Sequence, residues 1–318
     1  MARKPAKPDP VTAKPCEAYD WVGLHVFHGG DLDDLLTRSV APLVRGLEAT
    51  GRLTGWFFER SRLDGPHLRL RLLPTRPEHV EDVRRTAHVR LTVPMTAGEA
   101  VVRQYGTKPL PDGPVRVEQH PYVRELEGCD HLAAMPAIER HFTESSNLAL
   151  ALLAGGPTHQ RLMHITLTHL TSALAASGLS MGETSVRALE CLEPSERPYV
   201  IRGARAAYQV HGSELRAWTS QMWTRPDTGG WPDSIRALAA HLTGTAPATA
   251  PAALPGRRGR RRWDDTAAGT DVHEVLSHCA HLFANRVGVT PQQEAHLRLL
   301  LAQTLNDLSS GRPNRVCV

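Results

Sequence analysis

The sequence predicts an α+β protein, an N-terminal antiparallel sheet with helices followed by a mainly helical C-terminal half. Two observations support this prediction. Up to about residue 130, short segments alternate apolar and polar side chains, as β-strands do, and turns rich in Gly and Pro separate them. From about residue 131, apolar side chains recur every three or four residues over long segments, which is the spacing of helices.

The predicted boundaries define one domain between two short ends. Residues 1–18 are rich in Pro and poor in apolar side chains, so we expect a disordered lead-in. The domain then covers residues 19–308, and a tail follows at 309–318. Within the domain, the change of periodicity separates an α+β part (19–130) from a helical part (131–308).

Composition narrows the class of protein. The balance of 37 Lys and Arg against 33 Asp and Glu gives a net charge of +4, which is small for a dedicated nucleic-acid binder but suits an acidic peptide. The five cysteines are scattered without a C-x-x-C pair, which indicates reduced thiols and no structural metal. Neither a signal peptide nor a run of about 18 apolar residues is present. We therefore expect a soluble, cytoplasmic protein that binds neither nucleic acid nor membrane.

Strands and helices alternate in the predicted first half. Residues 21–27 alternate like a strand, and Asp31 then caps a helix that ends at Gly51. A β-hairpin covers residues 55–73, with its turn at Asp64-Gly65-Pro66. The other predicted elements are a helix from Pro77 to about Val89 and strands at 99–105 and 115–122.

The second half is predicted to be a series of helices. Gly155 and Gly178 close the first two, since Gly is the residue that most often follows a helix. The helices with clear periodicity are 137–153, 162–176, 232–242, 271–285 and 291–308, and residues 195–223 are weakly periodic.

The second strand of the hairpin carries the first candidate site. His67, Arg69 and Arg71 alternate with three leucines, so one face of the strand is apolar and the other cationic. An edge strand that resists pairing would explain one or two such charges. Three in a row, spaced about 7 Å apart, instead favour a pocket for an anionic group.

A polar helix face near the C-terminus is the second candidate site. His278, His281 and Asn285 share this face through i+3 and i+4 spacing, and Ser277 lies beside them in sequence. A neighbouring polar group could orient one imidazole as a general base. The alternatives are a buried histidine with a structural role and a metal site, although a third ligand with recognisable spacing is missing.

These segments resemble a known family. The resemblance rests on the strand that begins at Trp21, on Trp56-Phe57-Phe58 followed by Gly65-Pro66-His67-Leu68-Arg69-Leu70-Arg71, and on His281-Leu282-Phe283-Ala284-Asn285-Arg286 followed by Gly288 and Glu294. It covers roughly residues 19–308 and is similar to the thiopeptide-type bacteriocin biosynthesis family. That family is the stand-alone relative of the C-terminal glutamate-elimination domain of class I lanthipeptide dehydratases.

The resemblance implies two chemistries on one scaffold, both acting on a precursor peptide with a leader. Elimination enzymes hold a glutamyl ester of a peptide Ser or Thr with arginines and expel the glutamate, leaving dehydroalanine or dehydrobutyrine. Pyridine synthases join two dehydroalanines of one peptide in a formal aza-[4+2] cycloaddition. Loss of water and of the leader peptide then aromatises the ring and closes the macrocycle. We expect no cofactor and no metal.

A middle motif separates the two chemistries. Elimination domains resemble one another in a segment of the form Y-x-x-E-x-x-R-Y-G-G, of which Tyr122 and Glu125 survive here. The arginine position falls on Gly128, followed by Cys129-Asp130-His131. A reaction that expels a carboxylate would lose a stabilising cation at this position, although Arg124 could substitute if the alignment slips.

The sequence therefore predicts a pyridine synthase, with a glutamate-elimination lyase and a non-catalytic leader-peptide escort as alternatives. A cyclase must hold two alkenes together and move protons, which requires positioning and Tyr, His or carboxylate groups. The candidate catalytic residues are His281, Tyr122, His67, Glu125, Ser277 and His278, and the candidate substrate-binding residues are Arg69, Arg71, Arg60, Arg62 and Asn285. We expect the cationic strand to line the same cavity as His281. For Tyr122 and Glu125, ordinary sheet structure is an equal alternative.

A basic segment lies in the helical half. Residues 243–265 lack a packing pattern and are predicted to form an exposed loop, with five arginines between Arg257 and Arg262. These arginines could attract an acidic leader by long-range charge or remain solvated without a partner. Transient contacts with other enzymes of the pathway are the remaining expected partners.

Overall fold

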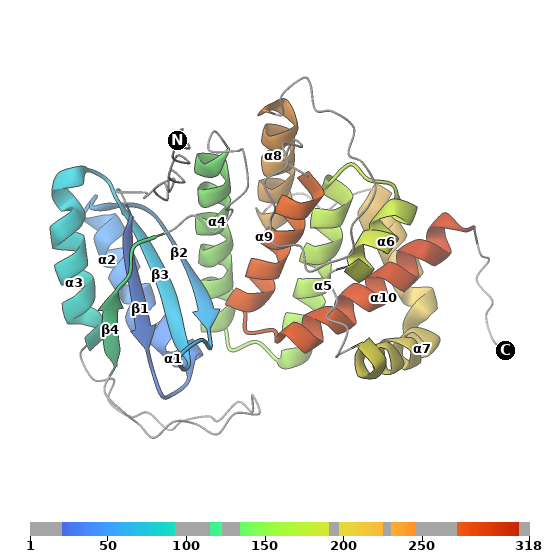
Figure 1. The fold of residues 1–318 in the computed structure, drawn as a ribbon, viewed down its shortest axis with the longest axis horizontal. Coiled ribbons are helices and arrows are strands. Elements are labelled where there is room, and N and C mark those ends of the chain that lie inside the picture. Colours follow the sequence, from blue (N-terminus) through green and yellow to red (C-terminus); the bar gives the residue numbers. More distant parts are fainter. Residues whose placement is uncertain are drawn as a thin grey trace, which may run out of the picture.

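The computed structural model describes residues 21–92, 115–122, 134–190, 197–224, 230–245 and 272–311. Within these ranges, an antiparallel sheet with its helices stands beside a larger group of helices formed by the second half of the chain (Figure 1). The predicted α+β class is therefore confirmed. The predicted strand at 99–105, the candidate residue Glu125 and the arginines of the basic segment lie outside the described residues.

The sheet of the described residues has four strands in the order β2-β3-β1-β4, and each neighbouring pair is antiparallel. Its strands are β1 Val22–Phe27, β2 Leu53–Ser61, β3 His67–Pro74 and β4 Arg116–Gln119. The predicted hairpin is formed by β2 and β3. In its turn, Asp64 and Gly65 have φ angles of 60° and 112°. Asp and Gly tolerate this left-handed region better than other residues, which is why their pairing predicted the turn.

Strand alternation divides the sheet into an apolar face and a polar face. Leu68, Leu70 and Leu72 of β3 are fully buried, and the strand register places buried residues of β1 and β2 beside them. Helices α2 (Ala41–Ala49) and α3 (Val80–Thr92) cover this face (Figure 1). Burial of one large apolar side chain contributes about 1.5–3 kcal/mol. The leucines therefore determine that His67, Arg69 and Arg71, which alternate with them, lie on the opposite face.

The segment between β1 and β2 begins at the predicted cap. The side chain of Asp31 accepts a hydrogen bond of 2.8 Å from the backbone N–H of Asp33, at the start of α1 (Leu32–Leu35). A π-helical turn, Leu36–Val40, joins α1 to α2. The later helix also starts as predicted, because Pro77 opens a 3₁₀ turn that leads into α3.

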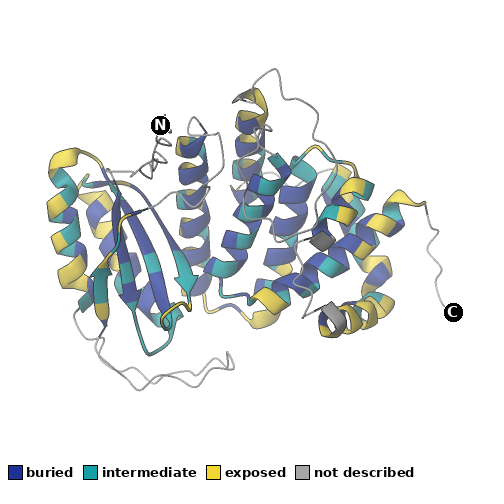
Figure 2. Ribbon diagram, in the orientation of Figure 1, coloured by how far each residue is buried: buried dark blue, intermediate teal, exposed yellow. Residues whose placement is uncertain are grey.

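Within its described residues, the helical half contains the five clearly periodic helices that the sequence predicts and two further ones. The bounds are α4 Met135–Ala154, α5 His159–Ala176, α6 Met181–Glu190, α7 Arg197–Thr224, α8 Gly230–Thr245, α9 Val272–Arg286 and α10 Pro291–Ser309. The weakly periodic segment is α7, whereas α6 was not predicted. Residues 243–245, which were predicted to begin the exposed loop, belong instead to α8, which continues through Thr245. Figure 2 shows buried residues along the sheet, α4, α5 and α9, and many exposed residues on α3 and α7.

Side chains of the helical half satisfy the backbone of the edge strand β2. Thr143 and Ser146 of α4 accept hydrogen bonds from the backbone N–H groups of Trp56 and Phe58, at 3.2 and 3.3 Å. Asn285 of α9 accepts a bond of 2.7 Å from the N–H of Arg60 and donates one of 2.9 Å to its carbonyl. These bonds replace the partner strand that an edge strand otherwise lacks.

Arg286 completes this junction from the core. Its guanidinium is fully buried and donates to the carbonyl of Phe58 at 2.9 Å and to the hydroxyl of Ser145 at 3.0 Å. It also lies 5.2 Å from the ring centroid of Phe142. Burial lowers the pKa of Arg286 to about 10, and the group remains charged at neutral pH. The sheet and the helical half are therefore joined by directed polar bonds as well as by apolar packing.

We predict that Asn285→Ala lowers the free energy of unfolding by about 1–3 kcal/mol, because the N–H and carbonyl of Arg60 lose their partner in a partly buried place. Urea denaturation followed by circular dichroism measures this change. Asn306→Ala is the matched control, since Asn306 is exposed on α10. A stability of Asn285→Ala equal to that of the control would mean that the junction does not depend on these two bonds.

Candidate active site

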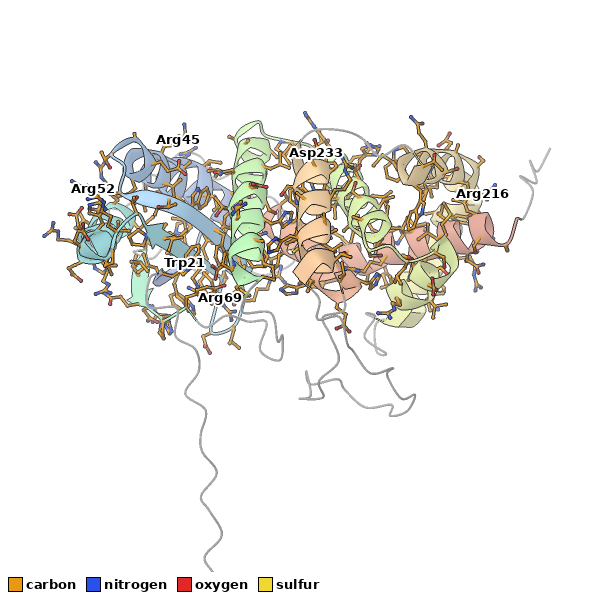
Figure 3. The ribbon with its side chains drawn as sticks, turned by 90° about the horizontal axis from the view of Figure 1, so that it is seen from above. Trp21, Arg45, Arg52, Arg69, Arg216 and Asp233 are labelled. Atoms are coloured by element: carbon orange, nitrogen blue, oxygen red, sulfur yellow. The ribbon has the colours of Figure 1, made fainter. Side chains whose placement is uncertain are left out.

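The polar face of the sheet carries a row of charged and titratable residues. In the strand register, Arg69 of β3 lies opposite Glu59 of β2 and His25 of β1, and His25 lies opposite Glu118 of β4. Facing residues on neighbouring strands have side chains within about 5 Å of each other at their Cβ atoms. Figure 3 places Arg69 and Trp21 on the side of the sheet that faces away from Arg45 of α2.

Three imidazole rings form a continuous stack on this face. The ring of His25 lies 4.8 Å from that of His67 and 3.9 Å from that of His120, centroid to centroid. Burial and the nearby charges of His120, Arg71, His67 and Arg69 lower the pKa of His25 to about 3. Burial also lowers the pKa of His67, whose Nδ1 donates to the carbonyl of Gly65 at 2.9 Å. At neutral pH the ring of His25, at the centre of the stack, is therefore uncharged.

The segment after β4 crosses the sheet at Gly23. A Cβ atom at this position would lie 2.0 Å from the carbonyl oxygen of His120, so only glycine allows the close approach. The backbone N–H of His120 donates to the carbonyl of Gly23 at 3.0 Å. This crossing brings His120 onto His25 and Tyr122 over Arg71.

Tyr122 and Arg71 lie together at a buried end of the polar face. The guanidinium carbon of Arg71 lies 5.7 Å from the ring centroid of Tyr122. The Tyr122 ring packs edge-on against Trp21 and Phe57, at centroid distances of 5.6 and 5.5 Å. Both Arg71 and Tyr122 are buried, whereas Arg69 is only partly buried. Of the two arginines, Arg69 is thus the better placed to meet a substrate directly, and Arg71 supports Tyr122.

On α9, His281 is held by a buried carboxylate of α10. Its Nδ1 lies 2.7 Å from a carboxylate oxygen of Glu294, while 44% of the side chain is exposed. The other oxygen of Glu294 accepts from Nε of Arg298 at 2.8 Å. Arg298 in turn donates to the hydroxyl of Ser277 at 3.0 Å and to its carbonyl at 3.2 Å. The predicted orienting group for a histidine base is therefore present, but it comes from the neighbouring helix.

His278 lies beside His281, with 6.2 Å between the ring centroids. Burial, followed by the charge of His281, lowers the pKa of His278 to about 4, and the ring is neutral at neutral pH. In the described part of the chain, no group of three or more His, Cys, Asp or Glu residues is arranged to hold a metal ion.

Two of the predicted substrate-binding residues have structural partners instead. The guanidinium of Arg60 is paired with Asp33 of α1 and donates to the carbonyl of Arg286 at 2.9 Å. The register also places Arg60 opposite Leu68, on the apolar face of the sheet. The side-chain amide of Asn285 is hydrogen-bonded to the backbone N–H and carbonyl of Arg60. We therefore leave Arg60 and Asn285 out of the proposed site. Arg62 is exposed in the hairpin turn.

The structure thus forms two groups from the remaining predicted residues. His67, Arg69, Arg71 and Tyr122 gather on the polar face of the sheet, and Ser277, His278 and His281 gather on α9. The hydrogen-bonded pair of Asn285 and Arg60 connects the two groups. Asn285 lies one helical turn after His281. Arg60 precedes Ser61, which lies opposite His67 in the strand register. That both groups line one cavity remains a prediction.

A wide-mouthed cavity of about 650 Å³ lies elsewhere, between α5 and α8. It is lined by Ala176, Arg236, Ala239, Ala240, Thr243 and Gly244. These residues offer one cation and no general base, so we do not assign chemistry to it. Among the described residues, no helix is long and apolar enough to cross a membrane.

Sequence reasoning assigned no site role to four residues of these groups, although Glu294 was one of the residues that carry the family resemblance. His25 and His120 could have been found only from strand pairing, because each is a single histidine in its own segment. Glu294 and Arg298 carried a clearer signal, since opposite charges at i and i+4 occur within an otherwise leucine-rich helix.

The chain thus combines a sheet face lined by arginines and histidines with a helical half that is joined to the edge of the sheet. This combination can be compared with known families. The chain belongs to the lantibiotic biosynthesis dehydratase C-terminal family, whose model matches residues 21–305. No curated protein matches the sequence.

Several solved structures share the fold, among them the following three. The tRNA-dependent lantibiotic dehydratase MibB from Microbispora sp. 107891 matches with a TM-score of 0.60 and 19% identity, over 95% of this chain and 29% of that one. The chain thus spans less than a third of the length of MibB. TbtD, a pyridine synthase from thiomuracin biosynthesis, matches with a TM-score of 0.59 and 16% identity, over 92% of this chain and 99% of that one. TsrL matches with a TM-score of 0.54 and 18% identity, over 91% and 95%.

We predict that His120→Gln raises the pKa of His25 from about 3 toward its ordinary value, because one of the neighbouring charges that disfavour the imidazolium is removed. Burial, the largest cause, remains, so the rise should be partial. Titration of the ring resonances by NMR measures it. His88→Gln is the control, since His88 is exposed on α3. An unchanged pKa of His25 in His120→Gln would assign the whole shift to burial and to the other neighbours.

Proposed function

We propose that this protein modifies a ribosomally made precursor peptide and acts as a pyridine synthase. The reaction would be a formal aza-[4+2] cycloaddition between two dehydroalanines, followed by loss of water and of the leader peptide. Membership of the dehydratase C-terminal family supports an enzyme acting on such a peptide. The match to TbtD, which includes 99% of that chain, supports the pyridine synthase in particular.

The observation that carries the proposal is the contact between His281 and the buried carboxylate of Glu294, which orients an accessible imidazole. Cyclisation forms two C–C bonds, because the ring nitrogen is already bonded to both of its neighbours in the ring. The reaction also moves the amide proton, expels water and finally breaks the C–N bond to the leader. His281, whose Nδ1 is bound by Glu294, has the geometry of a general acid and base for these transfers. Arg69, which is partly buried on the polar face, would stabilise negative charge that develops on a substrate carbonyl oxygen.

The sheet face would mainly hold the peptide in place. Bringing two alkenes of one flexible chain into contact can supply up to about 7–11 kcal/mol of the barrier. Tyr122, fixed between Trp21 and Phe57 and above Arg71, offers a rigid aromatic wall for this purpose. Rigid side chains lose little entropy when the substrate binds.

Glutamate elimination is the second candidate function, and the cationic strand itself favours it. Arg69 and Arg71 are neighbours on one face and could bind a glutamyl carboxylate. Against this stands Gly128, which occupies the position of the arginine in the elimination motif. A leader-peptide escort without chemistry would retain the fold and the peptide binding alone.

We predict that the purified full chain converts a synthetic precursor peptide carrying two dehydroalanines into a pyridine-containing macrocycle and free leader, without added nucleotide, nicotinamide or metal. Mass spectrometry reads the product. The same chain should release no glutamate from a glutamylated precursor, because Gly128 supplies no cation. Release of glutamate would favour the lyase, and binding without either product would favour the escort.

Arg69→Gln should lower the rate of this reaction about 10²-fold and leave the urea midpoint nearly unchanged, since one stabilising donor is lost from a partly exposed place. Arg90→Gln is the control, because Arg90 is exposed on α3, which covers the other face of the sheet. Equal rates for the two variants would remove Arg69 from the active site.

A further inference from the structure

We infer that Glu294 is a positioning residue that fixes the tautomer of His281, with Arg298 and Ser277 holding Glu294 in place. The proton of the neutral ring would lie on Nδ1, and Nε2 would face the substrate as the proton acceptor. The use of Nε2 in the reaction rests on the proposed function. The placement of the proton on Nδ1 rests on the contacts alone.

Two interactions keep Glu294 ionised in spite of its burial. Burial by itself would raise the pKa of this carboxyl group, but the hydrogen bond from His281 and the charge of Arg298 outweigh it and lower the pKa to about 2. Glu294 is therefore ionised throughout the physiological range. An ionised carboxylate can only accept hydrogen bonds, so the 2.7 Å contact requires that Nδ1 of His281 donates.

Buried contacts hold Glu294 in a fixed position. Only 6% of the Glu294 side chain is exposed, and the same is true of Arg298. Arg298 bonds Glu294 on its own helix and both the hydroxyl and carbonyl of Ser277 on α9. Since Ser277 lies one turn before His281 on α9, the network returns to the helix that carries the histidine. Glu294 is thus held from both helices.

The turn between α9 and α10 positions Glu294 beside α9. Gly288 has φ 80°, and the N–H of Val289 donates to the carbonyl of Ala284 at 2.9 Å, which ends α9 with a left-handed residue. Thr290 then starts α10 with a capping box, in which its side chain accepts from the N–H of Gln293 at 3.3 Å. Glu294 follows directly, in the first turn of α10, and faces α9.

The ion pair of Glu294 and Arg298 needs an explanation other than stability. A buried ion pair contributes little net stability, because desolvation of the two charges offsets their attraction. Here the pair lies under a histidine whose side chain remains 44% exposed. A carboxylate that holds the far nitrogen of an accessible imidazole is the usual device for orienting a proton-transfer group. The arrangement is better explained by orientation of His281 than by stability.

The direct test is the tautomer of His281 in the full-length protein. Labelling with ¹⁵N-histidine and comparison with His281→Asn assigns its ring resonances. We expect protonated Nδ1 and unprotonated Nε2 in the neutral ring. The opposite tautomer in the wild-type protein would overturn the inference, and this measurement needs no variant of Glu294 to fold and no activity.

Glu294→Gln provides the second test. Its amide can donate to Nδ1, so we expect a shift of the ring proton toward Nε2 and a fall in kcat of at least 10²-fold, with KM within a few fold. Glu294→Asp, which keeps the carboxylate, should recover part of the kcat and the original tautomer. A folded Glu294→Gln protein with wild-type kcat and tautomer would contradict the inference.

The matched control is Glu214→Gln on α7. Glu214 also faces a histidine, since its carboxylate lies 3.6 Å from Nδ1 of His211, but the two side chains are 83% and 60% exposed. We expect wild-type kcat and KM from this variant. If the wild-type protein shows the expected tautomer but forms no macrocycle, the proposed function fails while the inference stands.

Discussion

The fold depends on how the edge of β2 is satisfied. A buried edge strand needs partners for its outward N–H and carbonyl groups, and each unmet group costs about 1–3 kcal/mol. Hydroxyls of α4 and the side chains of Asn285 and Arg286 supply these partners in this protein. Because the bonds are directional, the helical half can dock against the sheet in one register only. Apolar packing alone would tolerate a shift along the strand.

This register also sets the position of the candidate active site. Asn285 and Arg286 lie in the last turn of α9, and His281 lies one turn earlier on the same helix. The residues that join the two halves therefore determine where His281 stands relative to β3. The turn at Gly288 and the capping box at Thr290 then bring Glu294 back against α9. Structural and proposed catalytic roles are thus distributed over adjacent residues of one helix.

Crowding of cationic groups gives the site its electrostatic character. His25 stands among two other histidines and two arginines, and it stays neutral because an added charge would be repelled and poorly solvated. On α10, by contrast, Glu294 is ionised, because the hydrogen bond from His281 and the charge of Arg298 lower its pKa to about 2. One candidate group thus holds a neutral imidazole and the other an ionised carboxylate. Under the proposed function, these groups would serve the proton transfers of cyclisation.

The sequence by itself determined the elements whose signals are local. Alternation predicted the cationic face of β3, Asp64-Gly65 predicted the turn, and helical spacing predicted α9 and α10, since each depends on neighbouring residues only. Helix α6 was missed because its buried positions include small polar residues, Thr184 and Ser185, that carry no apolar periodicity. Tertiary structure decided the rest. Arg60 lies on the apolar face through its pairing with Leu68, and the His25 stack and the Glu294 pair join segments far apart in sequence or on separate helices. Such contacts follow from strand register and helix docking, which are properties of the whole chain and leave no pattern in any one segment.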